Sequence, residues 1–188
     1  MPVHEPPARL FASKAGSQRH RTNPPGAHVA SRRFSHLAWP GGPGRVGQRP
    51  DAASGGQTRA AAAAIAAAAR AGGHEADVRP LAGTDADALG RADVVFVGTW
   101  VEGFLVVGVG PARAAREWMA RLPALSGKPA AVFCTYALNP RGTLSALQAD
   151  LERKGARVLA RRAFHRRHPD EGAGALVREV LARLSTDP

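Results

Sequence analysis

Two pairs of residues in this chain place a hydroxyl beside an aromatic ring at the end of an apolar run. Thr99 and Trp100 follow the run 94–98, and Thr135 and Tyr136 end the run 128–136. A hydroxyl supplies hydrogen bonds and an aromatic face supplies stacking. Ligands of open α/β sheets bind beyond the carboxyl ends of the strands. These two pairs are therefore the first place to look for function.

Other residues with chemical potential lack the partners that their chemistry requires. Cys134 has no local histidine to activate it, so we expect a structural thiol in a buried strand. Gly108 and Gly110 lack the third glycine and the acid of a dinucleotide-binding fingerprint. His165 and His168 have no carboxylate or cysteine set to complete a metal site, so this segment is expected to be a solvated basic edge.

The elements that would position the two pairs alternate between strand and helix. The run 94–98 has no polar alternation, which predicts a strand buried on both faces. Strands are predicted at 74–81, 94–98, 128–136 and 157–160, helices at 58–71, 111–122, 143–155 and 170–184, and a short connector at 86–90. This α/β alternation predicts an open, mostly parallel sheet with helices on both faces.

Residues 1–53 differ from the rest of the chain. They contain eight of the 15 prolines and four of the seven histidines, without an apolar period. Such a segment buries too little apolar surface to offset the entropy of ordering. We therefore predict a disordered, basic, Pro/Gly/Arg-rich segment at 1–53 and one α/β domain at 54–188.

The formal net charge of +11 is concentrated in the same segment. Residues 1–59 hold nine basic and two acidic residues, a net charge of +7, against +4 for the remainder. Nucleic-acid binding is thus a hypothesis for the basic tail alone, and not for the domain. The chain has one cysteine and no apolar run of about 18 residues, which predicts a cytoplasmic protein without a membrane span.

Several stretches in the right order resemble the flavodoxin family over residues 54–188. They are Gly56-Gln57-Thr58-Arg59, Val94-Val95-Phe96-Val97-Gly98-Thr99-Trp100, Leu125-Ser126-Gly127-Lys128-Pro129-Ala130-Ala131-Val132-Phe133 and Cys134-Thr135-Tyr136. The resemblance implies a flavodoxin-like sheet in the order 2-1-3-4-5, non-covalent binding of FMN, and electron transfer. The cofactor-binding residues that it implies are Ser54, Gly55, Gly56, Gln57, Thr58, Thr99, Trp100, Thr135 and Tyr136.

Physical chemistry supports the parts of this implied site to different degrees. Trp100 and Tyr136 follow neighbouring strands, so their rings could lie on either side of one flat flavin ring. The phosphate requires backbone N–H groups and hydroxyls at a helix N-terminus. A glycine-rich turn at residues 53–58 would provide them, although Ala53 and Gly55 stand where the family pattern has hydroxyls. A glycine turn before a helix, without any phosphate site, is the alternative.

The strand that should precede the first helix is atypical or absent. In the order 2-1-3-4-5 the first strand lies inside the sheet, and losing it would remove several buried aliphatic side chains at about 1.5–3 kcal/mol each. Residues 34–39 are the only candidate, and they require a connection of about 15 residues. We therefore expect residues 1–50 to be a wrong-frame or misassigned start.

The leading functional prediction is an FMN-binding protein in electron transfer or flavin-dependent oxidoreduction, either an electron carrier or an FMN-dependent oxidoreductase. Its partner would be a redox protein or a small-molecule acceptor. The alternative is a degenerate flavodoxin-fold domain that binds no flavin and acts as an interaction module. The electron partner, the substrate and the oligomeric state are left open by the sequence.

Overall fold

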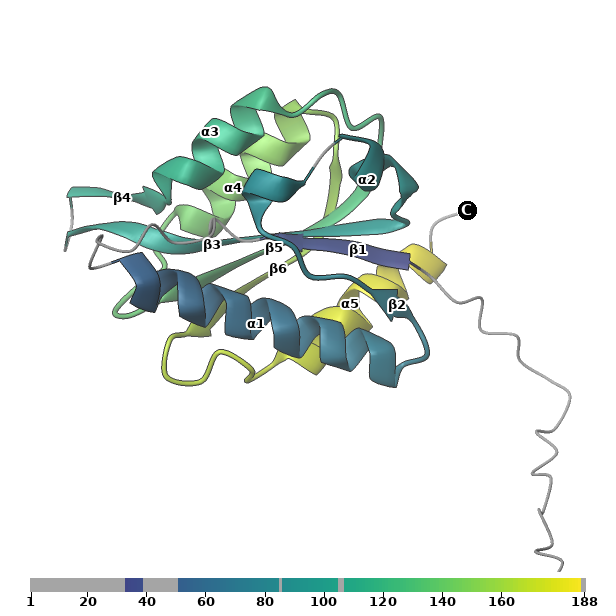
Figure 1. The fold of residues 1–188 in the computed structure, drawn as a ribbon, viewed down its shortest axis with the longest axis horizontal. Coiled ribbons are helices and arrows are strands. Elements are labelled where there is room, and N and C mark those ends of the chain that lie inside the picture. Colours follow the sequence, from purple (N-terminus) through teal and green to yellow (C-terminus); the bar gives the residue numbers. More distant parts are fainter. Residues whose placement is uncertain (1–32, 39–50, 85, 105–106, 187–188) are drawn as a thin grey trace, which may run out of the picture. The chain divides into compact units, whose positions relative to one another are not determined.

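A computed structural model describes residues 33–38, 51–84, 86–104 and 107–186 of the chain (Figure 1). Contacts divide the chain into residues 1–30 and 31–188, and every described residue belongs to the second unit. The elements of that unit are β1 (Arg33–Ala38), α1 (Asp51–Ala71), β2 (Glu75–Ala76), the 3₁₀ turn η1 (Leu81–Gly83), α2 (Ala86–Arg91), β3 (Val94–Phe104), β4 (Val107–Pro111), α3 (Arg113–Arg121), β5 (Pro129–Tyr136), α4 (Thr143–Arg153), β6 (Arg157–His165) and α5 (Ala173–Ser185).

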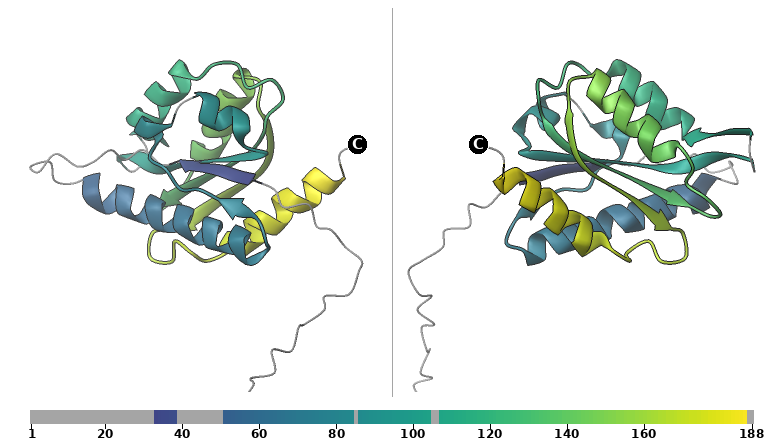
Figure 2. Two further views of the ribbon diagram at one scale, coloured as in Figure 1. Left: turned by 45° about the vertical axis from the view of Figure 1, so that its right-hand side comes forward. Right: turned by 180° about the vertical axis from the view of Figure 1, so that it is seen from behind.

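Five strands form a parallel sheet in the order β2-β1-β3-β5-β6, and β4 pairs antiparallel with the outer part of β3. The parallel strands thus follow the predicted order 2-1-3-4-5. Helices α1 and α5 cover one face, and α2, α3 and α4 cover the other (Figures 1 and 2). The α/β class and the flavodoxin-like order expected from the sequence are confirmed.

The place of the first strand is filled by β1. Its register pairs Phe34 with both Ala76 of β2 and Val94 of β3. The Phe34 side chain is buried, with its ring centroid 5.7 Å from that of Phe96 and 4.9 Å from that of His74. The first strand is thus present and atypical, at the candidate segment 34–39: one buried phenylalanine anchors β1, where the sequence offers no continuous apolar run.

The predicted disorder of residues 1–53 falls mainly on 1–32 and 39–50, which lie outside the described residues. The described parts of that segment are β1 and the start of α1. The sheet therefore includes residues ahead of the predicted domain boundary at residue 54.

Two other predicted boundaries differ from the structure. Helix α1 begins at Asp51, seven residues before the predicted start at Thr58. Strand β3 does not end at Gly98 but continues to Phe104, and with β4 it forms an antiparallel hairpin where a loop was expected. The sequence pattern missed this extension because β3 changes there from a buried central strand to a partly exposed hairpin.

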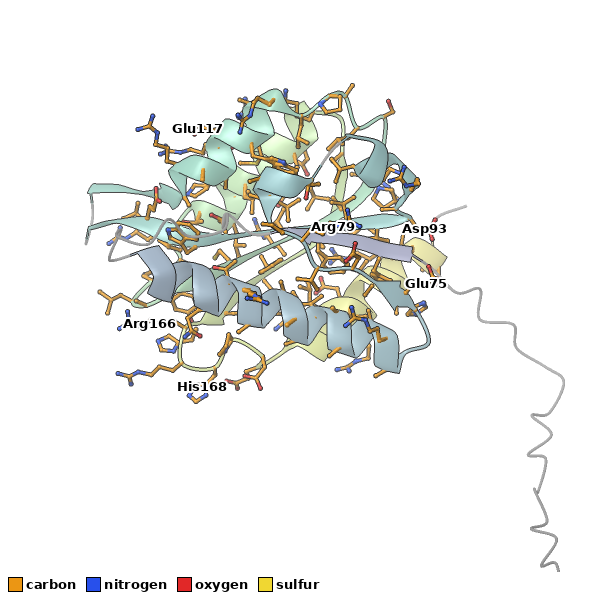
Figure 3. All side chains as sticks on the ribbon, viewed as in Figure 1. Glu75, Arg79, Asp93, Glu117, Arg166 and His168 are labelled. Atoms are coloured by element: carbon orange, nitrogen blue, oxygen red, sulfur yellow. The ribbon has the colours of Figure 1, made fainter. Side chains whose placement is uncertain are left out.

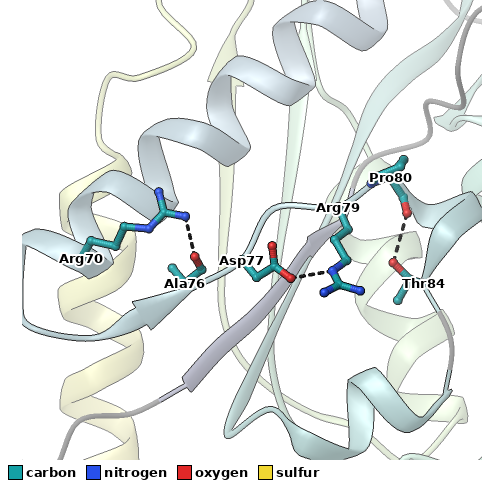
Figure 4. Close-up of polar contacts among 6 residues, drawn as sticks. All are labelled: Arg70, Ala76, Asp77, Arg79, Pro80 and Thr84. Atoms are coloured by element: carbon teal, nitrogen blue, oxygen red, sulfur yellow. Dashed lines mark hydrogen bonds and ion pairs between the residues drawn. The ribbon is translucent and has the colours of Figure 1, made fainter.

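The predicted strand 74–81 is reduced to the two residues of β2, and polar contacts fix the chain beyond it (Figure 4). The Arg70 guanidinium donates to the Ala76 carbonyl, and the Thr84 hydroxyl donates to the Pro80 carbonyl. Asp77 pairs with Arg79 through its carboxylate, and its amide donates to the Phe34 carbonyl. These contacts replace ladder hydrogen bonds, so the segment runs along the edge of the sheet as a loop.

The two faces of the sheet are packed differently. Under α1 and α5, four phenylalanine rings fill the core beneath small helix residues: Phe34, Phe96, Phe133 and Phe164 lie against Ala61, Ala62, Ala66 and Ala69. The other face is built from Leu, Val, Trp118 and Met119. The alanines let α1 approach the sheet closely, which places its N-terminal end beside the carboxyl ends of the strands (Figure 1). No helix among the described residues is long and apolar enough to span a membrane.

Candidate functional site

A pocket of about 560 Å³ lies where the parallel ladder between β3 and β5 ends. Its lining residues come from α1, two neighbouring strands and the loop after β6: Gln57, Trp100, Val101, Thr135, Tyr136, Ala137, Arg166 and Arg167. Four of the nine residues predicted from the sequence are therefore brought together at one cavity, namely Gln57, Trp100, Thr135 and Tyr136. This is the end of a parallel sheet where ligands bind in α/β folds.

Strand pairing explains why the two aromatic pairs meet. The β3–β5 ladder sets Thr99 opposite Cys134 and Trp100 opposite Thr135. Trp100 and Tyr136 are both half-buried: Trp100 lies where the ladder ends within β3, and Tyr136 is the last residue of β5. A half-buried ring has one part of its surface held by the protein and another part available to a ligand. The geometry is suited to a flat, apolar ligand.

Thr58 supports the pocket from behind. Its hydroxyl lies 2.7 Å from the Thr135 hydroxyl, and both side chains are buried. This contact joins α1 to the end of β5 and holds the wall in place. It also occupies the Thr58 hydroxyl that the phosphate-loop prediction assigned to a ligand.

Thr99 faces away from the pocket. Its fully buried hydroxyl accepts a hydrogen bond from the Ala112 amide at 3.0 Å. Glu102 accepts from the next amide, that of Arg113, at 2.7 Å. Because successive side chains of a strand point to opposite faces, Thr99 satisfies the Ala112 amide at the start of α3 while its neighbour Trp100 lines the cavity on the other face.

The predicted phosphate-binding turn is helical. Residues 54–58 lie within α1, which begins at Asp51. In an α-helix only the first four amides lack a partner inside the helix, so of these residues only Ser54 is among them. The amides of Gly55, Gly56, Gln57 and Thr58 are directed at carbonyls one turn earlier.

Arg166 and Arg167 are the pocket residues that sequence reasoning missed. They belong to the segment 165–168, which was expected to be a solvated basic edge. Arg166 is exposed at the end of the sheet where α1 begins (Figure 3). The β5–β6 register, which pairs Tyr136 with His165, carries the loop after β6 to the pocket. The predicted strand 157–160 is five residues shorter than β6 (Arg157–His165). The correct length would have placed Arg166 and Arg167 directly after the strand, at the end of the sheet where the pocket lies.

Cys134 is buried in β5, and its burial raises the pKa of the thiol to about 12. Such a thiol stays protonated at neutral pH and is a poor nucleophile. Among the residues that the structure describes, no group of three or more His, Cys, Asp or Glu could hold a metal ion.

Neither a protein-family model nor a curated protein sequence matches this chain. Solved structures do match it. The two-electron reduced flavodoxin of Megasphaera elsdenii is 20% identical with a TM-score of 0.59, over 80% of this chain and 98% of that one. Flavodoxin 1 from Bacillus cereus is 16% identical with a TM-score of 0.59, over 83% and 99% of the two chains. The Streptococcus pneumonia flavodoxin is 17% identical with a TM-score of 0.58, over 80% and 99%. The chain has a flavodoxin-like fold.

Proposed function

We propose that this protein binds FMN in the pocket at the ends of β3 and β5, and that it acts in electron transfer or flavin-dependent oxidoreduction. The observation that supports this most strongly is the placement of Trp100 and Tyr136 at one cavity, together with Thr135, the strand partner of Trp100. Flavodoxins with the same fold give the proposal its direction.

The ring side of the pocket fits a flavin. Trp100 and Tyr136 offer aromatic surface for stacking on a flat ring. The Gln57 amide and the Thr135 hydroxyl lie at the same cavity as hydrogen-bonding groups. The phosphate side fits less well, because the amides of residues 55–58 are used within α1.

The roles of the protein's own residues are binding and orientation. The two aromatic rings exclude water from the faces of the bound ring, and the Thr58–Thr135 contact fixes the wall on which it rests. FMN, once bound, supplies the electron-accepting and electron-donating chemistry. In this proposal electrons pass to a redox partner protein or a small-molecule acceptor. The proposed location is the cytoplasm, because a chain with a single cysteine forms no internal disulfide and suits a reducing compartment.

A second candidate function is an interaction module that keeps the fold without a flavin. The helical conformation of residues 54–58 favours it, since a family-type phosphate turn is not formed there.

Flavin titration separates the two candidates. We expect purified protein to show flavin absorbance, or to quench FMN fluorescence on titration, with saturation at one FMN per chain. Trp100→Ala and Tyr136→Ala should each weaken binding about tenfold, the loss of one stacking contact. Leu138→Ala is the matched control, because Leu138 follows β5 two residues after Tyr136, is 82% exposed and does not line the pocket. Absence of binding at high FMN concentration would leave the interaction module as the function.

A further inference from the structure

Two arginines of the loop between β6 and α5 line the pocket, and the proposed function does not use them. Arg166 and Arg167 are adjacent in the sequence, and both side chains are exposed. A guanidinium group is permanently charged and presents several donors in one plane, which suits a phosphate or carboxylate.

The loop is tied to the pocket wall through its backbone. The Arg166 amide donates to the Tyr136 carbonyl at 2.8 Å, and the Arg167 amide donates to His165 Nδ1 at 3.3 Å. Since Nδ1 accepts a hydrogen bond, the ring proton is on Nε2, which lies 3.0 Å from the Ala137 carbonyl and donates to it. The two arginines therefore extend from a backbone that is anchored to the end of β5.

The positive charge at this place has no ion-pair partner among the residues that the structure describes. Within the described residues, neither Arg166 nor Arg167 forms an ion pair, although Asp170 and Glu171 belong to the same loop. The acidic residues Glu75 and Asp93 lie at the opposite end of the sheet from Arg166 (Figure 3). Two like charges at one cavity favour an anion there, because an anion relieves their repulsion.

The amides of residues 55–58, where the sequence predicted the phosphate site, have partners inside α1. The cations of the β6–α5 loop offer another way to hold a phosphate at the same pocket.

We propose that Arg166 and Arg167 hold the anionic group of the ligand, so that the pocket selects a planar aromatic molecule carrying a phosphate. The inference rests on the proposed function, because the ring of that molecule occupies the site between Trp100 and Tyr136.

The test compares FMN with riboflavin, which has the same ring and no phosphate. Dissociation constants are measured by fluorescence titration for the wild type, for Arg166→Gln, for Arg167→Gln and for the double variant. Arg116→Gln is the control, because it removes the same charge from an exposed position on α3, away from the pocket. We expect the wild type to bind FMN at least tenfold more tightly than riboflavin. The double variant should lose about tenfold or more in FMN affinity and change riboflavin affinity by less than about twofold.

The outcomes distinguish this inference from the function on which it rests. A wild type that binds FMN and riboflavin equally overturns the anion site and leaves the flavin site standing. A preference for FMN that survives in the double variant also overturns it, and assigns the phosphate to another element. Failure of both ligands to bind overturns the proposed function and the inference together. If Arg116→Gln lost as much FMN affinity as the double variant, the cause would be the change in net charge, and the assignment would be contradicted.

Discussion

The two halves of the candidate site are built on different kinds of support. On one side, Trp100 and Thr135 are set opposite each other by the ladder between β3 and β5. On the other side, residues 54–58 were expected to form a turn and instead continue a helix from Asp51. Pairing between two buried strands fixes a register, whereas an alanine-rich helix can be lengthened at its end by residues of ordinary helix propensity.

The difference shows which sequence patterns fix the local structure and which do not. A one-residue slip of β3 would turn Val95 and Val97 out of one core and Val94 and Phe96 out of the other, so the strand has one stable register. No comparable penalty fixes the start of α1. The four predictions below test how firmly each half is held, beginning with the largest expected effect.

On the strand side of the site, adding a side chain at Gly98 should destabilise the protein. A Cβ atom there would lie 2.1 Å from Cζ of Phe133, a fully buried ring that cannot move aside. We expect Gly98→Ala to lower the free energy of unfolding by about 2–3 kcal/mol, measured by chemical denaturation.

Gly110→Ala in β4 is the matched control for this change, since a Cβ at Gly110 meets nothing within 4 Å. Equal stability loss in the two variants would show that overpacking against Phe133 is not the cause.

The contact between the two halves is the buried hydrogen bond of Thr58 with Thr135. Thr135→Val keeps the shape of the side chain and removes one hydroxyl of a pair separated by 2.7 Å. The expected loss is about 1–2 kcal/mol in the free energy of unfolding. A double-mutant cycle with Thr58→Val should give a coupling energy of about 1 kcal/mol.

Thr186→Val serves as the comparison, because Thr186 is exposed at the end of α5 and bonds only within its own helix. A coupling energy near zero between Thr58 and Thr135 would mean that α1 and the pocket wall are not held together by this contact.

The free energy of unfolding should also depend on pH, through the buried Cys134 of β5. Burial raises the pKa of the native thiol to about 12 from the ordinary value of 9.0. Between these values the unfolded chain releases the thiol proton and the native protein retains it, so stability is complete below pH 9 and falls as the pH rises. At pH 10 the loss should be about 1 kcal/mol.

The slope is isolated by comparing unfolding free energies of the wild type and Cys134→Ala from pH 8 to pH 10. Other groups titrate alike in both proteins, so only the wild type should show this additional decline. Parallel pH profiles would contradict a buried, protonated thiol.

The smallest expected effect is on the helix side of the site, where a side chain added at Gly56 should stabilise the protein. Gly56 lies inside α1, and a Cβ there meets nothing within 4 Å. Gly56→Ala should therefore raise the free energy of unfolding by about 0.5–1 kcal/mol and leave FMN affinity unchanged. Thermal unfolding and FMN titration measure the two quantities.

Gly127→Ala provides the contrast, because Gly127 has equal space but a φ of +78°, which strains any other residue. It should be destabilising. A Gly56→Ala variant that is less stable and binds FMN more weakly would instead support the turn predicted from the sequence.

Much of the fold follows from local sequence. The apolar runs of β3 and β5 are too continuous for anything but buried strands, and their spacing by helices requires parallel pairing. That pairing alone places Trp100 beside Thr135. The aromatic side of the pocket was therefore predictable from residue types and order.

Helix termini were less predictable. Thr143 resembles an N-cap in sequence, yet its buried hydroxyl has no hydrogen-bond partner among the described residues, and Gly142 occupies the cap position. Two lysines instead complete other helix ends from a distance in sequence. Lys128 donates to the carbonyls of Gly90 and Ala92 at the C-terminal end of α2, and Lys154 donates to those of Ala120 and Leu122 at the C-terminal end of α3.

The sequence by itself determined the strand types, their parallel order and the aromatic pairs at their ends, because burial on both faces leaves a strand no alternative. The tertiary structure decided the rest of the site. It filled the first-strand position with β1 through the single ring of Phe34, turned Thr99 toward α3, and brought Arg166 and Arg167 to the pocket. These outcomes depend on contacts between residues far apart in the chain, whose free energies no local pattern contains.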